Sequence, residues 1–467
     1  HRDLHSFPTR RSSDLGHYLS YSRQRLHITR YWTLQPAPTR QNEAAALEKA
    51  EHLLLAAIRR QSIADVPVGA MLSGGLDSSL ITVLMQRSQH QPLRTFTTAL
   101  RAADVKLERM PEDSEFAKTL AREQGFLHEE ILLQPDMVSL LPKMIWHMEE
   151  PVADAAAINT YLIAGRARQN GVVVLLNGMG ADESWGGYRK HLACLRAGTY
   201  QHMLPAAARR TLEQFATLLP VASRHTGIRS LRWLKRFLSF PSLPPLERYL
   251  ASDLSFTRVE YEQLFVDPIA YESTNYYLSE NRVYQADEAD YVSKMCLLDT
   301  LFFLPQHNLL YSDKAAMAAG VESRPPFTNH ELIELAYTVS PDLRIKGSEQ
   351  KYLLRRVAGR YLAPAILNRG KASFGSPLRA WLRGPLRELI DEILSFHNVK
   401  ARGLYNPAVV QEKIKADRAG RADHSYLIWQ LLTIEIWFKL FIDKSPEYCF
   451  YEHNTEAKND ETNSAGL

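Results

Sequence analysis

Short apolar runs alternate with amphipathic stretches between residues 43 and 176. Helical spacing of apolar side chains is typical of helices that pack on a core, and short apolar runs are typical of buried parallel strands. Strands are therefore expected at 66–72, 93–100, 129–133 and 172–176. Helices are expected at 43–60, 76–87, 114–124, 142–147 and 159–168. Because strands alternate with helices, the sequence predicts an α/β fold built on a doubly wound parallel sheet.

Helical patterns dominate the second half of the chain. Residues 190–300 are helix-rich, are punctuated by prolines and contain no repeat, which predicts a large helical layer on the sheet. The apolar stretch 426–442 is interrupted by three polar residues and is short for a bilayer, so it predicts a buried C-terminal helix rather than a membrane span. The end, 446–467, is polar and is expected to be disordered.

Composition narrows the class of protein. The 467 residues carry 56 basic and 52 acidic side chains, a formal net charge of +4. This balance argues against a dedicated nucleic-acid-binding protein and favours small-molecule substrates. The three cysteines, Cys194, Cys296 and Cys449, are far apart and form no disulfide or metal-binding pattern. Together with the lack of a secretory signal pattern, this predicts a cytoplasmic protein without a membrane partner.

The first forty residues divide into two segments. Residues 5–15 match the translation of one reading frame of a common sequencing-adapter oligonucleotide, so we expect residues 1–15 to be an artefact fused to a truncated gene. A natural basic arm would explain the composition but not this string. Residues 16–32 have the pattern of strands and a turn, and 35–38 have that of a linker. The main folded unit is expected to span residues 41–445.

A glycine turn follows the first predicted parallel strand. The sequence from Leu72 to Ser79 is Leu-Ser-Gly-Gly-Leu-Asp-Ser-Ser. The two glycines let the backbone approach an anion closely, and the helix that follows offers unpaired N–H groups and the positive end of its dipole. The serine hydroxyls add donors, and Asp77 is a hard oxygen ligand of the kind that magnesium prefers. The turn predicts a phosphate site, although it lacks the Lys-Ser/Thr end of a Walker A motif.

A second polar loop follows the last of these predicted strands. Residues 177–188 are Asn-Gly-Met-Gly-Ala-Asp-Glu-Ser-Trp-Gly-Gly-Tyr. Because ligands bind beyond the carboxyl ends of parallel strands, this loop is expected to face the glycine turn across a nucleotide. Over residues 17–442 the chain resembles the synthetase domain of the glutamine-hydrolysing asparagine synthetases, which have the PP-loop ATP pyrophosphatase (adenine nucleotide alpha hydrolase) fold. The motifs that carry the resemblance are 72–79, 150–154, 177–188, 313–318, 322–327 and 368–377.

The resemblance implies ATP-dependent amidation. A substrate carboxylate would attack the α-phosphorus of ATP, giving an acyl-adenylate and pyrophosphate, and ammonia would then displace AMP. Catalysis would depend on Asp77 and Asp182 as magnesium ligands and on Lys371 as the cation that neutralises the α-phosphate and the leaving pyrophosphate. The pyrophosphate part of ATP would be bound by Ser73, Gly74, Gly75, Asp77, Ser78 and Ser79. The adenosine would be enclosed by Leu72, Thr98 and Gly178.

The resemblance also implies that half of the protein is missing. The glutaminase domain of this family begins with a nucleophilic cysteine, and no cysteine precedes Cys194 in this chain. Residues 16–40 would then be the end of that domain and its linker, and the chain as given would use free ammonia only.

Three departures from the family pattern fall near the expected acceptor. Met179 stands where many asparagine synthetases have glutamate, and a thioether cannot take a proton, which leaves that duty to water, Glu183, Tyr188 or the substrate. Lys314 replaces the usual arginine, and Thr328-Asn329 replaces Leu-Asp, so the acceptor pocket is expected to differ.

The identity of the acceptor therefore stays open. Aspartate, amidated to asparagine, is the first candidate, and a uronic acid of a surface polysaccharide or a secondary metabolite is the second. A third interpretation is a nucleotide-binding protein without catalysis. Arg324 either contacts a carboxylate or pairs with Glu322, and the oligomeric state is not fixed by the sequence, a homodimer being one candidate.

Overall fold

The computed structural model describes residues 16–108 except 24, 35 and 37–41, residues 113–203, scattered residues between 205 and 238, and residues 243–252, 258–267, 289–369 and 375–445. The artefact expected at 1–15 and the tail expected at 446–467 lie outside the described residues, as do Lys371 and Cys449.

The main sheet is parallel throughout. Its five strands lie in the order β5 (Leu127–Leu132), β4 (Arg94–Ala99), β3 (Val68–Met71), β6 (Val174–Leu176) and β9 (Glu322–Arg324). The strand that comes first in sequence, β3, is central, with β4 and β5 added on one side and β6 and β9 on the other. This order confirms the predicted doubly wound fold. In such sheets ligands bind beyond the strand ends where the winding reverses, which here is between β3 and β6.

Helices cover both faces of the sheet because alternate strand residues point to opposite sides. One face packs on the largest hydrophobic cluster together with α1 (Glu43–Gln61), α2 (Leu76–Arg87), α4 (Asp113–Gln124), α16 (His330–Thr338) and α17 (Tyr352–Ala358). The other face packs on α6 (Ala156–Gln169) and α15 (Leu310–Met317). The residues that point to the first face are Ala70, Leu72, Val174 and Leu176, and those that point to the second are Met71, Phe96 and Leu175.

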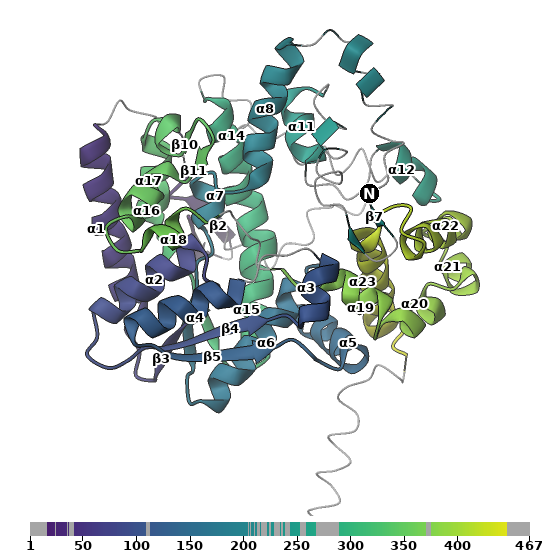
Figure 1. Ribbon diagram of the computed structural model, residues 1–467, viewed down its shortest axis with the longest axis horizontal. Coiled ribbons are helices and arrows are strands. Elements are labelled where there is room, and N and C mark those ends of the chain that lie inside the picture. Colours follow the sequence, from purple (N-terminus) through teal and green to yellow (C-terminus); the bar gives the residue numbers. More distant parts are fainter. Residues whose placement is uncertain are drawn as a thin grey trace, which may run out of the picture.

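The C-terminal helices form a separate layer, on the right in Figure 1. They pack with α5 (Met137–Met148) on a second hydrophobic cluster. These helices are α19 (Leu378–Arg383), α20 (Arg387–Ile393), α21 (Phe396–Arg402), α22 (Pro407–Arg418) and α23 (Ser425–Phe441). Helix α23 confirms the predicted buried C-terminal helix, with Leu432 and Ile436 fully buried. Among the described helices, none is both long and apolar enough to span a bilayer.

A third group of helices stands above the strand ends. It contains α8 (Arg189–Met203), α11 (Pro245–Ala251) and α14 (Tyr291–Leu298). After α14 the chain continues as an 11-residue π-helix, η2 (Asp299–Leu309), which leads into α15. Helices of this wide type are rare and often occur at functional sites. The sequence analysis predicted helices over 190–300, which includes α8, α11 and α14, but it made no prediction for most of η2.

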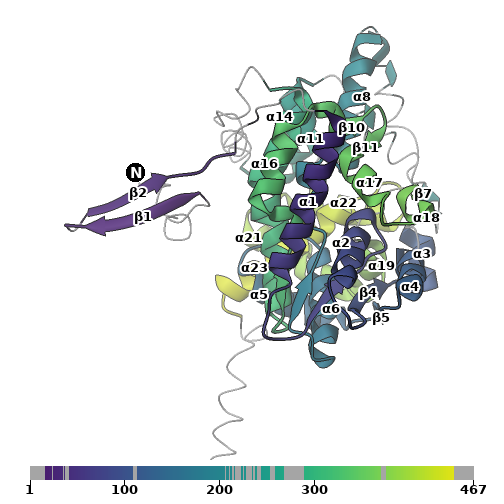
Figure 2. The same ribbon diagram turned by 90° about the vertical axis from the view of Figure 1, so that its left-hand side faces the viewer.

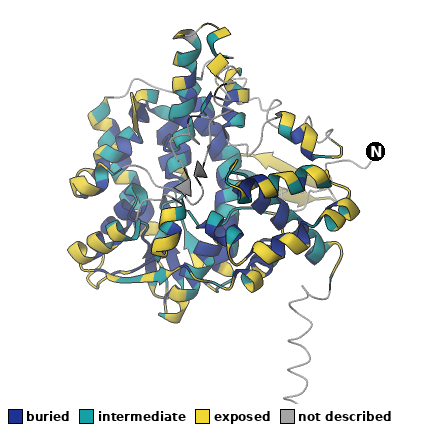
Figure 3. Ribbon diagram, turned by 45° about the vertical axis from the view of Figure 1, so that its right-hand side comes forward, coloured by how far each residue is buried: buried dark blue, intermediate teal, exposed yellow. Residues whose placement is uncertain are grey.

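The hairpin formed by β1 (His17–Ser22) and β2 (Arg25–Arg30) projects from the body (Figure 2). Its residues are exposed on both faces, which Figure 3 shows in yellow. The exposed side chains include Tyr18, Leu19, Tyr21, Leu26 and Ile28. An isolated two-stranded hairpin is marginally stable in water. Its root is attached where the Trp32 indole N–H donates to Glu334 Oε1 of α16 at 2.5 Å.

Candidate active site

The glycine turn lies at the carboxyl end of β3, directly before α2. Gly75 is the N-cap of α2 and provides no side-chain cap, so the first N–H groups of the helix face outward from its end. Gly74 has φ +69°, and a Cβ there would lie 2.7 Å from the carbonyl oxygen of Asp113 on α4. The conformation and the close packing both require glycine at this position.

Serine hydroxyls hold the turn in shape. Ser78 Oγ accepts a hydrogen bond from the backbone N–H of Ser73 at 3.1 Å and lies 2.9 Å from Ser73 Oγ. Ser79 is fully buried at the start of α2. The hydroxyls of Ser73 and Ser78 therefore converge at the mouth of the turn, whereas Ser79 packs into the core.

The second loop touches the first. A Cβ on Gly178 would lie 2.9 Å from Asp77 Cβ and 3.1 Å from the backbone nitrogen of Ser78. The loop is fixed at its start by Asn177, whose Oδ1 accepts from the Met179 N–H at 3.0 Å and whose Nδ2 donates to Ser323 Oγ at 2.7 Å. Leu72, Thr98 and Gly178 come at the carboxyl ends of β3, β4 and β6, so the structure brings the sequence-predicted adenosine residues to one edge of the sheet.

Lys351 bridges the two predicted magnesium ligands. Its Nζ donates to Asp77 Oδ2 at 2.6 Å and lies 2.6 Å from Asp182 Oδ1. Burial acts against the charge of this lysine, but the carboxylates of Asp182 and Asp77 outweigh burial and raise its pKa. Lys351 thus stays protonated at neutral pH and holds the two loops together across the point where the sheet reverses.

Gly187 makes this bridge sterically feasible. A Cβ at this position would lie 2.0 Å from both Asp182 Oδ1 and Lys351 Cε. The Gly187 N–H donates to the Asp182 carbonyl at 2.8 Å, and Gln350 Nε2 donates to the Gly186 carbonyl at 3.0 Å. The hairpin that leads to Lys351, β10 (Ile345–Lys346) and β11 (Glu349–Gln350), is in this way tied to the second loop.

The same two carboxylates fit a divalent cation. An ammonium group already lies within 2.6 Å of an oxygen of each, so one cation can contact both. Hard oxygen ligands suit magnesium, which is usually bound by one or two carboxylates together with substrate phosphates and water. Among the described residues, no group of three or more metal-ligating side chains occurs.

Lys371, the cation expected at the phosphates, lies outside the described residues, but its neighbours in sequence are placed. Arg369 donates from Nη1 to the Gly74 carbonyl at 2.6 Å and pairs with Asp113. On the other side, Ser376 Oγ donates to the Ala155 carbonyl at 2.8 Å. The two flanks are therefore attached to the glycine turn and to the loop before α6.

Glu183 stabilises the second loop from within. It is buried, and its Oε2 accepts from the Gly180 N–H at 3.1 Å. Its Oε1 accepts from the Tyr188 hydroxyl at 2.6 Å and from Asn308 Nδ2 at 2.5 Å. Burial, with the nearby charge of Asp182, raises the pKa of Glu183. These donors fix the loop that presents Asp182.

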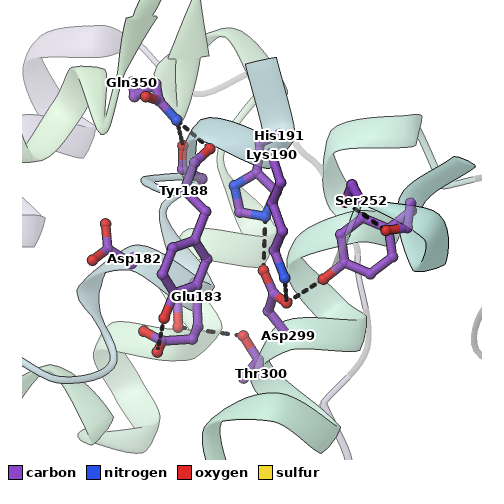
Figure 4. Close-up of polar contacts among 12 residues, drawn as sticks. Asp182, Glu183, Tyr188, Lys190, His191, Ser252, Asp299, Thr300 and Gln350 are labelled. Atoms are coloured by element: carbon purple, nitrogen blue, oxygen red, sulfur yellow. Dashed lines mark hydrogen bonds and ion pairs between the residues drawn. The ribbon is translucent and has the colours of Figure 1, made fainter. Parts of the chain in front are cut away.

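A buried ionic cluster continues from this loop into η2 (Figure 4). Asp299 accepts from Lys190 Nζ at 2.6 Å, lies 2.7 Å from His191 Nε2 and is hydrogen bonded by the Tyr249 hydroxyl. Burial alone would raise the pKa of Asp299, but the Lys190 cation and His191 keep it below its usual value. In Figure 4, Asp182 and Asp299 lie on either side of the Tyr188 ring, so the cluster anchors the loop from the side opposite the site.

Arg324, whose role the sequence left open, has structural contacts. Arg324 pairs with Glu322 at 2.8 Å and donates to the carbonyl groups of Gln61 and Ile63, which ties β9 to the end of α1. Of its two alternatives, the structure favours pairing over carboxylate binding.

Lys314, which replaces the usual arginine of the family, donates to the Met148 carbonyl at 2.7 Å and to Glu149 at 2.8 Å. It thus joins α15 to the end of α5. Thr328 packs its methyl group 3.1 Å from the position of a Cβ on Gly180, and Asn329 caps α16. Met179 is half-buried against the second hydrophobic cluster.

Lys351 was missed by sequence reasoning because it belongs to none of the motifs. In the structure Lys351 is the N-cap residue of α17, in a left-handed conformation with φ +51°, and its side chain is 7% exposed. A lysine is seldom buried without a charged partner, so its burial between two carboxylates, which only the structure shows, is the sign of a site.

Comparisons with known proteins agree with the geometry. Residues 49–439 match the family described as asparagine synthase. The chain is 28% identical to asparagine synthetase [glutamine-hydrolyzing] 1 of Bacillus subtilis and 30% identical to a putative asparagine synthetase [glutamine-hydrolyzing] of Mycobacterium bovis, with 89% and 90% of this chain covered. It is 25% identical over 86% of its length to amidase chyE of Penicillium rubens. The chain spans 62%, 62% and 63% of these three relatives.

Proposed function

Because the chain belongs to the asparagine synthase family, we propose that it is the synthetase part of a carbon–nitrogen ligase that adenylates a carboxylate with ATP and converts it to an amide, releasing AMP and pyrophosphate. The observation that carries the proposal is the Asp77–Lys351–Asp182 bridge, which unites the glycine turn and the second loop where a parallel sheet binds its ligand.

The nucleotide would bind across this bridge. The N-terminus of α2 and the converging hydroxyls of Ser73 and Ser78 are suited to the pyrophosphate part of ATP. Asp77 and Asp182 would hold magnesium, which when bound would neutralise phosphate charge. Leu72 and Gly178, at the ends of β3 and β6, would enclose the adenosine.

Two lysines would stabilise the charge that develops on phosphate. The carboxylates raise the pKa of Lys351, so this residue remains a fixed cation next to the bound phosphates. Lys371 is proposed in the same role because its flank at Arg369 is bonded to the glycine turn. Lys351 is positioned before the reaction, which lowers the cost of reorganisation in the transition state.

Aspartate is the first acceptor that we propose, with asparagine as the product. Two observations keep another carboxylate in consideration. Met179 is half-buried where many asparagine synthetases have glutamate, and one relative is named an amidase. Ammonia is the proposed nitrogen donor for the chain as given. The described cysteines, Cys194 and Cys296, are buried, and burial raises the pKa of Cys296 to about 12, so neither suits attack on glutamine.

The exposure of the hairpin formed by β1 and β2 supports the proposal that it is the end of a glutaminase domain. Its apolar side chains on both faces would be covered by the rest of such a domain, which agrees with the 62% span of the relatives. We propose a cytoplasmic enzyme, and we leave a homodimer as one candidate for its assembly.

The test is a reaction of the purified chain with ATP, magnesium, ammonium and a panel of carboxylates. We expect carboxylate-dependent formation of AMP and an amide detected by mass spectrometry, with aspartate the most active acceptor and no amide from glutamine alone. Formation of a different amide would show that its parent carboxylate, rather than aspartate, is the acceptor. Absence of AMP with every carboxylate would refute the proposal and leave a nucleotide-binding protein without catalysis.

A further inference from the structure

Arg369 reaches the glycine turn from a distant part of the chain. It follows α18 (Pro364–Leu367), whose Ile366 is buried in the largest hydrophobic cluster and whose Leu367 carbonyl accepts a hydrogen bond from Arg355 of α17. These contacts fix the backbone just before Arg369. The side chain of Arg369 is only 7% exposed. A charge buried to this extent is costly unless it is hydrogen bonded, so its partners indicate what it does.

The guanidinium group of Arg369 connects the glycine turn to α4. Its Nη1 donates to the Gly74 carbonyl at 2.6 Å, and its Nη2 pairs with Asp113 in the first turn of α4. The central carbon of the guanidinium lies 4.5 Å from the centre of the Phe116 ring. Asp113 and Phe116 thus hold the plane of the guanidinium in one orientation, with an N–H aimed at the Gly74 carbonyl.

This contact determines how the peptide group between Gly74 and Gly75 is oriented. In a trans peptide the C=O and the N–H point in opposite directions. Because the carbonyl is turned towards Arg369, the Gly75 N–H points the other way, towards Ser73 Oγ, which accepts it at 3.4 Å. That side is the mouth of the turn, where the hydroxyls of Ser73 and Ser78 converge. A hydrogen bond of 3.4 Å is weak, so a phosphate oxygen can replace it.

Without an external contact, this peptide group would be free to rotate. A flip changes mainly ψ of Gly74 and φ of Gly75, and glycine tolerates either sign of these angles. Packing around Gly75 does not oppose the flip, because Ser73 Oγ, at 3.3 Å, is the contact that a Cβ there would make among the described residues. A flipped peptide would present a carbonyl oxygen where an anion needs an N–H.

We propose that Arg369 is a positioning residue that holds the Gly74 carbonyl away from the nucleotide and so directs the Gly75 N–H at the pyrophosphate part of ATP. The inference rests on the function proposed above and names the residue that sets the shape of its phosphate site. Arg369 acts through the peptide group, because its Nη1 is on the Gly74 carbonyl and its Nη2 is on Asp113. A planar fork with two separate donors suits this task, and the single ammonium of a lysine does not.

The test measures binding of the two parts of ATP separately to the full chain, by titration calorimetry extended to millimolar ligand. Magnesium pyrophosphate reports on the glycine turn, and adenosine reports on the strand ends that would enclose the nucleoside. Adenylation is followed in parallel as carboxylate-dependent exchange of pyrophosphate with ATP in the absence of ammonium, using the acceptor most active in the parent protein.

The variants separate the orientation of the peptide from other roles of the arginine. Arg369→Ala removes the guanidinium, and Arg369→Lys keeps a charge without the fork. Arg369→Ala is also combined with Lys371→Ala, because Lys371 is two positions away and is itself proposed to contact phosphate. The control is Arg356→Ala, since Arg356 lies on α17, is 59% exposed and pairs loosely with Glu43 at 3.9 Å.

We expect Arg369→Ala to weaken pyrophosphate binding about 30-fold, the effect of one hydrogen bond to a charged group, and to leave adenosine binding within about threefold of the parent. Exchange should fall with pyrophosphate binding. Arg369→Lys should bind pyrophosphate at least about tenfold more weakly than the parent, and Arg356→Ala should change nothing. In the Lys371→Ala background, Arg369→Ala should cause the same further loss, because independent contacts add.

Pyrophosphate binding within about threefold of the parent in Arg369→Ala would overturn the proposal. Equal loss of adenosine binding would also overturn it, by assigning Arg369 a structural role. Parent-like binding by Arg369→Lys would overturn it by showing that charge alone suffices, and so would disappearance of the Arg369→Ala effect in the Lys371→Ala background, by showing that Arg369 acts through Lys371. A parent protein that binds neither probe and shows no exchange would instead refute the proposed function.

Discussion

Lys351→Met is the substitution that tests the site most directly. It keeps most of the length of the side chain and removes the ammonium that lies 2.6 Å from oxygens of Asp77 and Asp182. Two carboxylates would then face each other without a cation. Removing one partner of a fully buried ion pair costs about 3–5 kcal/mol. Because the side chains of Asp77 and Asp182 are 19% and 23% exposed, we expect a loss at the lower end, about 3 kcal/mol.

Magnesium gives this prediction a second signature. In the parent protein the ammonium occupies the position between the carboxylates, so magnesium without nucleotide should stabilise the fold little. In Lys351→Met the metal can take that position, and at about 100 times its dissociation constant it would restore about 2.7 kcal/mol. The carboxylate-dependent exchange of pyrophosphate should nevertheless stay at least about 100-fold below the parent.

The pH dependence of the bridge has a defined sign. The folded-state pKa of Lys351 is raised above the value in the unfolded chain, so its contribution to stability is fully present below the unfolded value. That contribution is lost only as pH rises through the folded-state pKa. The difference in unfolding free energy between the parent and Lys351→Met should therefore hold across neutral pH and shrink at strongly alkaline pH.

The assay is urea unfolding followed by circular dichroism, with and without magnesium. Lys346→Met is the matched control, because Lys346 lies on the same hairpin, is 53% exposed and pairs with Glu43 at only 3.6 Å. It should cost less than about 1 kcal/mol. If Lys351→Met unfolds within about 1 kcal/mol of the parent and shows no response to magnesium, the reasoning about the bridge is wrong.

Three further results are expected. Gly187→Ala places a Cβ 2.0 Å from Asp182 Oδ1 and should reduce exchange of pyrophosphate at least about 100-fold. The control Gly165→Ala, in open space on α6, should leave exchange intact and raise stability by about 0.5–1 kcal/mol. Equal effects of the two substitutions would contradict the packing argument. Asp77→Ala should abolish exchange of pyrophosphate. The far-ultraviolet circular dichroism should stay unchanged, because Lys351 keeps its contact with Asp182. Release of AMP at the parent rate would exclude Asp77 as a metal ligand. Amide hydrogens of β1 and β2 should exchange faster than those of β4, measured by mass spectrometry, because almost all residues of these two strands are exposed among the described part of the chain. Protection equal to that of β4 would show that the hairpin is packed in solution.

The sequence specified the parts of the site that are local in the chain. The glycine turn and the loop at 177–188 each follow an apolar strand, so spacing alone placed both at one edge of the sheet. Strand β9 was not predicted because its three residues, Glu322 to Arg324, are polar and have no alternation that a short window could detect. Nor did any pattern indicate that η2 is a π-helix, since its wider pitch depends on the contacts that it makes.

The Asp77–Lys351–Asp182 bridge could not be predicted from short sequence patterns, for another reason. Each carboxylate belongs to a recognisable motif, but their shared partner comes from a separate part of the chain and becomes notable only when it is buried between them. Likewise, Glu183 was considered as a proton acceptor from its position in the loop. The structure instead surrounds it with donors from Gly180, Tyr188 and Asn308, which the sequence could not reveal.

The distance along the chain between the members of the bridge governs when the site can form during folding. Asp77 and Lys351 are separated by 274 positions, and β3 pairs with β6 only after about a hundred residues have been looped out. Contacts of such long range form slowly because the entropy of closing the loop is lost before the contact forms. During synthesis on a ribosome, the glycine turn would emerge long before its lysine, so the early chain would hold an acidic turn without its counter-charge. A fragment that ends before residue 351 should fold its first strands and helices yet bind nucleotide weakly, and adding the remainder as a separate peptide should restore binding.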